Sequence, residues 1–233
     1  MLESYGGLYD LVYGAKDYAA ETEKLRGIVH GRSPGAKTLL DVACGTGQHL
    51  YHLRRDYDAE GLDLSEAQLQ VARKRNPHCA LHLGDMLTFD LARRFDVVTC
   101  LFSSVGYLRS VEALSQAVAN MARHVKPGGL LVVEPWLTPE SWLPGTLWSD
   151  YVDQPNLKVA RISVSELKGR LALIDFHILV ARDAEVDYFR ERHELTLFTE
   201  DEYMASFSNA GLDVTFDPEG LIGRGLYVGL TPG

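Results

Sequence analysis

The sequence contains few cysteines, and no two of them form a CxxC pair. Cys44, Cys79 and Cys100 are the three cysteines among 233 residues. An odd number at this spacing predicts neither a disulfide framework nor a structural zinc site. We therefore expect a chain that binds no metal and works in a reducing compartment, the cytoplasm.

Long apolar runs and an excess of positive charge are also missing. No run of 18 apolar residues occurs, which argues against a transmembrane helix. The first residues, Met1 to Tyr5, lack a basic region followed by an apolar one, so no signal peptide is expected. Lys and Arg number 23 against 32 Asp and Glu, a formal charge of −9. Nucleic acids and anionic membranes attract basic surfaces, so neither is expected as a partner.

From residue 37 onward, apolar strands alternate with amphipathic helices. Near-continuous apolar strands between helices are typical of a parallel sheet that is covered on both faces. We therefore predict an α/β, Rossmann-like sheet with helices on both faces. Its strands are expected at residues 37–42, 59–64, 80–83, 95–102, 130–134, 212–216 and 225–230.

The pattern changes after Pro135. Residues 135–156 are rich in Pro and Trp, which predicts a loop. Three later runs alternate apolar and polar residues with period 2, which predicts an antiparallel three-stranded insertion. These runs cover residues 157–167, 170–181 and 186–198.

Three parts of the chain follow from these patterns. Residues 1–36 are expected to form an N-terminal helical cap or lid, and residues 37–135 with 199–233 the ligand-binding core. Residues 136–198 make up the insertion. We expect this insertion to contribute to the substrate site or to pack against a second copy in a homodimer.

The most informative stretch is the glycine turn Asp41-Val42-Ala43-Cys44-Gly45-Thr46-Gly47. Its glycines allow a ligand to approach the backbone, and the helix that follows offers unpaired N–H groups. A dinucleotide fingerprint needs Gly or Ala at the third small position, where Leu50 stands, and no Walker A lysine follows. The turn therefore favours a nucleoside without phosphates. His49, in the same helix, is expected to be solvated.

Acidic residues end the next two predicted strands. Asp63 ends the second strand, and Asp85 follows the third within Gly84-Asp85-Met86. The carboxyl ends of parallel strands meet at one edge of the sheet, where ligands bind. The Asp63 carboxylate suits the two hydroxyls of a ribose, and Asp85 suits an adenine amino group, with Met86 packed on the ring. Together with the glycine turn, these residues predict an S-adenosylmethionine site.

At these residues the sequence resembles the class I S-adenosylmethionine-dependent methyltransferases, which implies a seven-stranded sheet. It is most similar to the N,N-dimethyltransferases of dTDP-linked 3-amino-3,6-dideoxysugars, the desosamine and mycaminose type of antibiotic biosynthesis. The resemblance rests on Lys16-Asp17-Tyr18, Leu39 to Gly47, Gly84-Asp85-Met86, Phe102-Ser103-Ser104-Val105-Gly106-Tyr107, Val133-Glu134-Pro135-Trp136 and Gly223-Arg224-Gly225-Leu226.

The resemblance implies a role for residues of each motif. The donor, S-adenosyl-L-methionine, would be held by Asp41, Ala43, Gly45, Gly47, Asp63, Leu64, Asp85, Met86, Phe102 and Ser103 and would leave as S-adenosyl-L-homocysteine. The small-molecule acceptor, a nucleotide-linked aminosugar, would face Tyr5, Tyr18, Tyr107, Trp136 and Arg224. Tyr107 would be the catalytic residue that orients the nucleophile.

Transfer of a methyl group from a sulfonium depends mainly on alignment of the reactants. An amine must lose its proton before it attacks, and a hydrogen-bond acceptor is enough for this, so no strong general base is expected. Two departures from the family stand near the expected acceptor site: Leu137 replaces a tryptophan, and Leu221-Ile222 replaces Pro-Ser. They leave another small-molecule N- or O-methyltransferase open. An NAD-linked oxidoreductase and a cofactor-binding protein without catalysis stay open as well.

Overall fold

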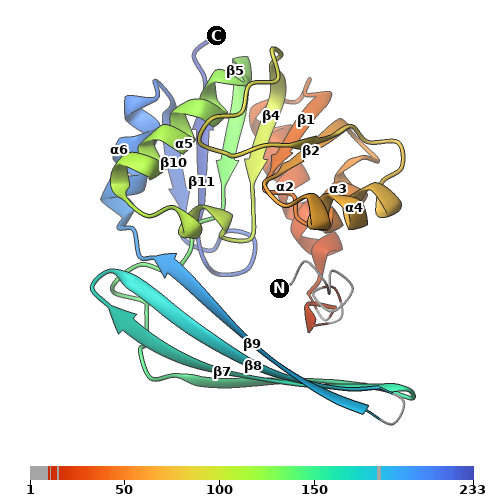
Figure 1. Ribbon diagram of the computed structural model, residues 1–233. Coiled ribbons are helices and arrows are strands. Elements are labelled where there is room, and N and C mark those ends of the chain that lie inside the picture. Colours follow the sequence, from red (N-terminus) through yellow and green to blue (C-terminus); the bar gives the residue numbers. More distant parts are fainter. Residues whose placement is uncertain (1–9, 11, 15, 183–184) are drawn as a thin grey trace.

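A seven-stranded sheet runs through the upper part of the molecule in Figure 1. The computed structural model describes residues 10, 12–14, 16–182 and 185–233. The strand order is β10-β11-β5-β4-β1-β2-β3, with β11 antiparallel to both of its neighbours and the other pairs parallel. The strands are β1 (Thr38–Val42), β2 (Asp58–Asp63), β3 (Leu81–Leu83), β4 (Phe95–Cys100), β5 (Val125–Val133), β10 (Asp213–Asp217) and β11 (Leu226–Leu230). The predicted seven-stranded α/β fold is confirmed.

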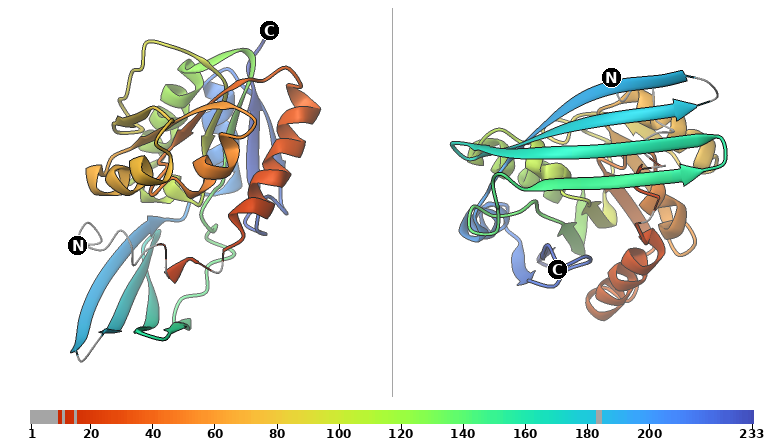
Figure 2. Two further views of the ribbon diagram at one scale, coloured as in Figure 1. Left: turned by 90° about the vertical axis from the view of Figure 1, so that its right-hand side faces the viewer. Right: turned by 90° about the horizontal axis from the view of Figure 1, so that it is seen from below.

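Helices cover both faces of this sheet because strand side chains point alternately to either side. Leu40 and Val98 pack with α5 and α6, whereas Leu39 and Val97 pack with α2 and α3. Figure 2 shows α2 and α5 on opposite sides of the sheet. The helices are α2 (Tyr18–Arg32), α3 (Gln48–Leu53), α4 (Glu66–Arg75), α5 (Val111–Arg123) and α6 (Glu200–Asn209), with a short 3₁₀ helix, η2 (Ser104–Tyr107).

Side-chain caps mark where four of these helices begin, and at α2 the Asp17 side chain accepts from the Ala20 N–H. Ser65 and Ser110 each accept a hydrogen bond from a backbone N–H of the first turn. Thr199 and Glu202 form a complete capping box at α6, in which each side chain accepts from the other's backbone. Such caps satisfy backbone N–H groups that have no partner within the helix. Because only a few residue types can do this, the cap residues indicate in the sequence where these helices begin.

The insertion differs from its prediction, because it has four strands instead of three. They are β6 (Leu147–Gln154), β7 (Leu157–Lys168), β8 (Leu171–Arg182) and β9 (Glu185–Thr196), antiparallel in this order. Residues 147–154 were expected to be part of a loop, but β6 pairs with β7 along its whole length. Nearly all residues of β6 are exposed at the edge of the sheet. The strand therefore has no regular alternation of buried and exposed residues that the sequence could reveal. Figure 2 shows all four strands from below.

The two faces of this second sheet have different surroundings. Ser163, Phe176 and Glu191 are cross-strand neighbours on its inner face, and the first two line a cavity between the sheets. Ile162 and Leu179, on the outer face, are 46% and 47% exposed. The period-2 alternation predicted for residues 170–181 is confirmed in β8, whose inner-face residues include Ala172, Ile174, Phe176, Ile178 and Val180.

None of the helices that the structure describes is both long enough and apolar enough to cross a membrane.

Gly47 offers a test of how the glycine turn is built. Its φ is +74°, and a Cβ there would lie 2.4 Å from Asn76 Nδ2, which donates to the Gly47 carbonyl. We expect Gly47→Ala to lower the free energy of unfolding by about 2–4 kcal/mol, because strain adds to a displaced buried amide. Gly45→Ala is the matched control: its φ is +57°, but no described atom lies within 4 Å. It should lose only about 1 kcal/mol. Urea unfolding measures both, and equal losses would contradict the packing argument.

Candidate active site

The Asp63 carboxylate ties the end of β2 to the glycine turn after β1. Asp63 Oδ2 accepts from the Gly45 N–H at 2.7 Å, and Oδ1 accepts from the Ser65 N–H at 2.8 Å. Burial raises the pKa of Asp63, and these backbone hydrogen bonds oppose the rise. Each oxygen keeps a second lone pair, so the carboxylate can still accept from a ligand.

Asp63 lines a cavity of about 300 Å³ at the carboxyl ends of β1, β2 and β3, called here the middle cavity. Asp85 also lines it, with Oδ1 accepting from the Leu87 N–H at 2.9 Å. The other lining residues are Ala43, Gly45, Leu62, Leu64, Gln68, Gly84, Met86, Ser104, Tyr107 and His193. The structure therefore gathers the residues predicted for a ribose and an adenine around one space.

A second, small cavity of about 50 Å³ lies beside the glycine turn. Four residues that the resemblance assigns to the donor line it, namely Asp41, Ala43, Gly45 and Phe102. Tyr18, expected to face the acceptor, lines this small cavity instead. Its remaining lining residues are Cys44, Thr46, Gln48, His49, Leu101 and Ser104. Gly47 lines none of the cavities described here, because its free side packs on Asn76 and Ala72.

Helix α2 explains the position of Tyr18. Glu21, in its first turn, accepts from Lys16 and lies 2.8 Å from His49 Nε2. His49 is therefore buried against α2, which corrects its expected solvation. The Tyr18 ring packs edge-on against the His49 ring at 4.9 Å between centroids.

The chain before α2 also contacts the glycine turn. Asp10 accepts from Thr46 Oγ1 at 2.7 Å and from Gln48 Nε2 at 3.1 Å, and it forms an ion pair with Arg75 at 2.5 Å. Asp10 stands in no motif, so sequence reasoning missed it. Tyr5, predicted to bind the acceptor, lies outside the described residues.

A strained turn follows β4. Phe102 and Ser103 have φ values of +52° and +64°, a left-handed conformation that is costly for residues with a side chain. The Phe102 N–H donates to Glu134 Oε2 at 2.6 Å, and Ser103 Oγ donates to the Pro135 carbonyl at 2.7 Å. Glu134 is fully buried, and burial raises its pKa. Its carboxylate holds this backbone through the hydrogen bond from the Phe102 N–H.

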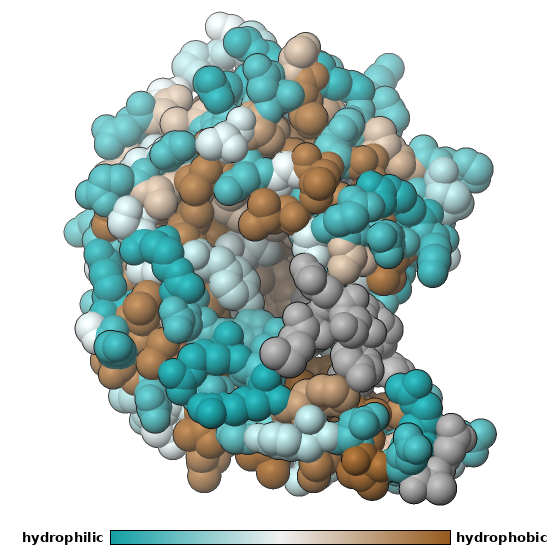
Figure 3. Space-filling model, viewed as in Figure 1, coloured by the Kyte–Doolittle hydropathy of each residue, from teal (hydrophilic) through white to brown (hydrophobic). Residues whose placement is uncertain are grey.

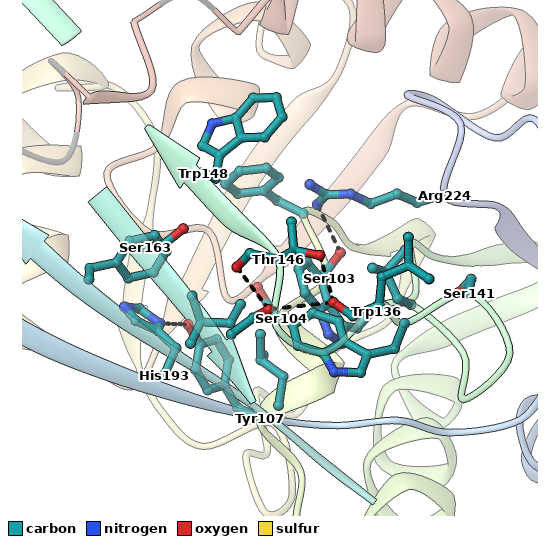
Figure 4. Close-up of a pocket in the computed structure, with 18 of the residues that line it drawn as sticks. Ser103, Ser104, Tyr107, Trp136, Ser141, Thr146, Trp148, Ser163, His193 and Arg224 are labelled. Carbon is teal, nitrogen blue, oxygen red and sulfur yellow. Dashed lines mark hydrogen bonds between the residues drawn. The ribbon is translucent and has the colours of Figure 1, made fainter. Parts of the chain in front are cut away.

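A large cavity of about 580 Å³ opens between the two sheets. Figure 3 shows the molecule hollowed there, and Figure 4 shows side chains from both sheets pointing into the space. Trp136 and Arg224, both predicted, line it. The Arg224 guanidinium lies 5.1 Å from the Trp136 ring centroid, and Nη1 donates to Ser103 Oγ at 3.3 Å.

Two further lining residues of the large cavity, Trp148 and Arg161, come from β6 and β7. The Arg161 guanidinium forms an ion pair with Asp150 at 2.5 Å and lies 4.8 Å from the Phe176 ring centroid. Neither residue belongs to a recognisable motif. The sequence signal that could have found Arg161 is a lone basic residue among the inward positions of β7.

The three cavities meet beside η2. Phe102 lines the small and large cavities, Tyr107 lines the middle and large ones, and Ser104 lines all three. Tyr107 Oη lies 2.5 Å from His193 Nδ1, and burial raises the pKa of this tyrosine. A ligand that fills the small and middle cavities would therefore have one end next to a ligand bound in the large cavity.

This fold and this arrangement of strand ends define a class I S-adenosylmethionine-dependent methyltransferase. The residues present fit that donor: Gly45 has an open side at a positive φ, and the carboxylates of Asp63 and Asp85 line the space beyond it.

Comparisons with known proteins agree with this class. A family model described as a methyltransferase domain matches residues 39–129. The dTDP-3-amino-3,6-dideoxy-alpha-D-glucopyranose N,N-dimethyltransferase of Streptomyces fradiae is 46% identical over 96% of this chain and 89% of its own length. DesVI of Streptomyces venezuelae superposes with a TM-score of 0.94 at 45% identity, covering 98% of each chain. SAM-bound CalS10, an amino pentose methyltransferase from Micromonospora echinaspora, has a TM-score of 0.90 at 39% identity, covering 97% of this chain and 96% of its own.

The chain belongs to the family of dTDP-aminosugar N,N-dimethyltransferases. The predicted family, enzyme class and methyl donor are confirmed. This membership sets the NAD-linked alternative aside.

Asp41 predicts a pH-dependent stability. Burial raises its pKa to about 6, and its side chain accepts from Thr99 Oγ1 at 2.8 Å. A carboxyl whose pKa rises on folding stabilises the fold below its unfolded pKa, near 4, and this contribution is lost as the pH rises through about 6. We expect Asp41→Asn to exceed wild type in free energy of unfolding by up to about 3 kcal/mol at neutral pH and to match it near pH 4.

Urea unfolding at a series of pH values measures this difference. Asp213→Asn, at an exposed position of β10, is the control. A difference between Asp41→Asn and wild type that stays constant from acid to neutral pH would contradict the assignment.

Proposed function

We propose that this protein transfers methyl groups from S-adenosylmethionine to the amino group of a dTDP-linked aminodeoxysugar, twice on the same nitrogen. The meeting of three cavities at Ser104 is the observation that carries the proposal. It is supported by relatives named for dTDP-aminosugar N,N-dimethylation at 46% identity.

The donor is assigned to the small and middle cavities. Ala43 and Gly45 would line its amino-acid part, Asp63 would accept from the ribose hydroxyls, and Asp85 with Met86 would hold the adenine. When bound, the donor supplies a methyl group on a positively charged sulfur. The chain's own contribution is to align that group with the acceptor and to exclude water.

The acceptor is assigned to the large cavity. Arg224 and Arg161 offer guanidinium groups for a diphosphate, and Trp136 and Trp148 offer aromatic faces for a ring. Tyr107, where this cavity joins the middle one, would orient the amine.

The two departures from the family have different settings. Leu137 lines the large cavity and so bears on which sugar fits. Leu221 is buried in the core with residues of α2 and β11. We infer that Leu137, and not Leu221, adjusts the acceptor specificity.

The division of the chain follows from these assignments. We propose that residues 37–135 and 199–233 bind the donor, that residues 136–198 complete the acceptor site, and that residues 1–36 form a lid. The contacts of Asp10 with Thr46 and Gln48 support the lid. The cytoplasmic location stays a prediction.

We also propose that two copies associate through the outer face of the second sheet. Figure 3 shows brown, hydrophobic surface along the lower edge of the molecule, where the second sheet lies (Figure 1). The outer face of that sheet exposes seven large apolar side chains, each between 37% and 72% exposed: Leu147, Tyr151, Ile162, Val164, Leu179, Val186 and Tyr188. Contiguous apolar surface of this kind marks protein–protein contacts.

A panel of acceptors tests the enzyme activity. We expect dTDP-3-amino and dTDP-4-amino deoxysugars to gain one and then two methyl groups by mass spectrometry, and free amines and phenols to gain none. Arg224→Gln should raise the KM for the sugar nucleotide about tenfold to a hundredfold and leave kcat within about threefold, because it removes binding far from the nitrogen. Calorimetry with S-adenosylhomocysteine should give the same Kd for this variant and wild type. Methylation of phenols without any aminosugar would overturn the proposal.

Light scattering after size exclusion tests the dimer. We expect a mass near twice the 25.9 kDa of the chain. The double variant Ile162→Glu, Leu179→Glu should give the monomer mass, because two buried charges would oppose association. Leu83→Glu, at a 60% exposed position on β3, is the matched control and should stay dimeric. Wild type that is monomeric across a wide concentration range would refute the dimer.

A further inference from the structure

A histidine of the second sheet contacts the tyrosine that is proposed to orient the amine. His193, on the inner face of β9, has Nδ1 2.5 Å from Tyr107 Oη and Nε2 3.1 Å from Glu191 Oε1. Its ring packs edge-on against Phe176 at 5.1 Å between centroids. Figure 4 shows the hydrogen bond between His193 and Tyr107 in the large cavity. Contacts thus run from the insertion to η2: the Glu191 carboxylate is paired with His193 Nε2, and His193 Nδ1 is hydrogen-bonded to Tyr107 Oη.

The two polar neighbours of the imidazole, Glu191 and Tyr107, determine which way the hydrogen bond to Tyr107 runs. An ionised carboxylate only accepts, so a neutral His193 places its hydrogen on Nε2, toward Glu191. Nδ1 is then the acceptor, and the Tyr107 hydroxyl must donate to it. Burial raises the pKa of Tyr107, so the phenol keeps the proton that it donates. The lone pairs of Tyr107 Oη are left for a donor from a ligand.

That oxygen lies where an acceptor and a donor would meet. Tyr107 and His193 both line the large and the middle cavities. An amine N–H that donates to Tyr107 Oη keeps the lone pair of its nitrogen for the incoming methyl group. A tyrosine hydroxyl turned the other way would instead donate to that lone pair and block it.

We infer that His193, held by Glu191, is a positioning residue that fixes the direction of the Tyr107 hydroxyl so that this oxygen accepts from the methyl acceptor. The inference rests on the proposed function. It adds two residues of the insertion to the machinery of methyl transfer. His193 takes up no proton in this scheme, and the proton lost by the amine between the two transfers goes to solvent.

Protonation of His193 would reverse the hydrogen bond. Both ring nitrogens then donate, and Tyr107 Oη must accept from Nδ1 and direct its own hydrogen into the cavity. The methyl acceptor must also lose its ammonium proton before it attacks. The active state of the wild type therefore requires two deprotonations, and an enzyme without the histidine requires one.

Several groups surround His193. Glu191 lies on its own strand and Tyr107 on η2, and β8 contributes the uncharged Phe176. Beyond Phe176 lies Arg161 of β7, which is paired with Asp150 of β6. The Tyr13 ring lies 4.8 Å from the Arg161 guanidinium, and the charge of Tyr13 would add to the raised pKa of Tyr107. Of the described carboxylates and cations named here, Glu191 is the one that is paired with the imidazole.

The test combines a mutant cycle with pH profiles. We expect Tyr107→Phe and His193→Ala each to lower kcat about tenfold to a hundredfold, with KM and the Kd for S-adenosylhomocysteine unchanged within about threefold. The double variant should lose no more than either single variant, because the two residues act as one unit. Glu191→Gln should fall between wild type and His193→Ala, since an amide can pair with either tautomer.

The pH dependence of kcat/KM in His193→Asn distinguishes a positioning role of His193 from a purely structural one. Asparagine offers an amide near the position of Nδ1 but does not titrate. At acid pH, where the imidazole and the amine are both protonated, log(kcat/KM) of wild type should fall with a slope approaching 2, and that of His193→Asn with a slope of 1. His177→Asn is the matched control, because His177 makes the same bond to Tyr188, at 2.6 Å, on the outer face. It should keep the wild-type slope.

The outcomes separate this inference from the proposed function. Fully additive losses for Tyr107 and His193, or a slope of 2 in His193→Asn, would overturn the inference in an active enzyme. Failure of the proposed function would show as a wild type that methylates no aminosugar. The cycle can be run on any acceptor that the wild type does methylate, so that result still decides the role of His193.

Discussion

The hydrogen bond from the Phe102 N–H to the buried Glu134 carboxylate holds the whole site together. At 2.6 Å it joins the ends of β4 and β5, and it secures a turn in which two residues with side chains have positive φ. Because of this turn, the Phe102 ring lies between the small and large cavities, and Ser104 borders all three. η2 starts in the same turn, so the position of Tyr107 depends on it as well. A relaxed backbone here would separate the donor side from the acceptor side.

The turn at Phe102 and Ser103 lies between two cavities that are built differently: one from adjacent strand ends, the other from segments far apart in the sequence. The proposed donor side lies at strand ends that are adjacent in the sheet, where Gly45, Asp63 and Asp85 line one cavity. The proposed acceptor side, the large cavity, is lined by residues of all four strands of the second sheet, of segment 136–146 and of the segment before β11. A change in the insertion can therefore alter the acceptor while the strand-end carboxylates stay in place. The position of Leu137 in the large cavity fits this division.

What the sequence could predict follows the same division. The sequence predicts the seven strands, the glycine turn and the two strand-end carboxylates. The signals for them are apolar periodicity, turn residues and motif spacing, which depend only on neighbouring residues in the chain. β6 was not predicted, since an exposed edge strand carries no burial pattern. The expected solvation of His49 was wrong, because the surroundings of this residue depend on how α2 packs on α3. Arg161 and His193 stand in no motif, and only the antiparallel register of the second sheet aims them at the large cavity.

The site concentrates features that lower the stability of the empty protein. Of the four described residues other than glycine with positive φ, Ala43, Phe102 and Ser103 line the cavities and Ala92 does not. Asp41 and Glu134 are buried carboxyls whose pKa is raised by that burial. Such costs persist where function requires them. A ligand that binds to the folded state alone offsets part of such a cost, so the cost does not prevent folding once the ligand is bound.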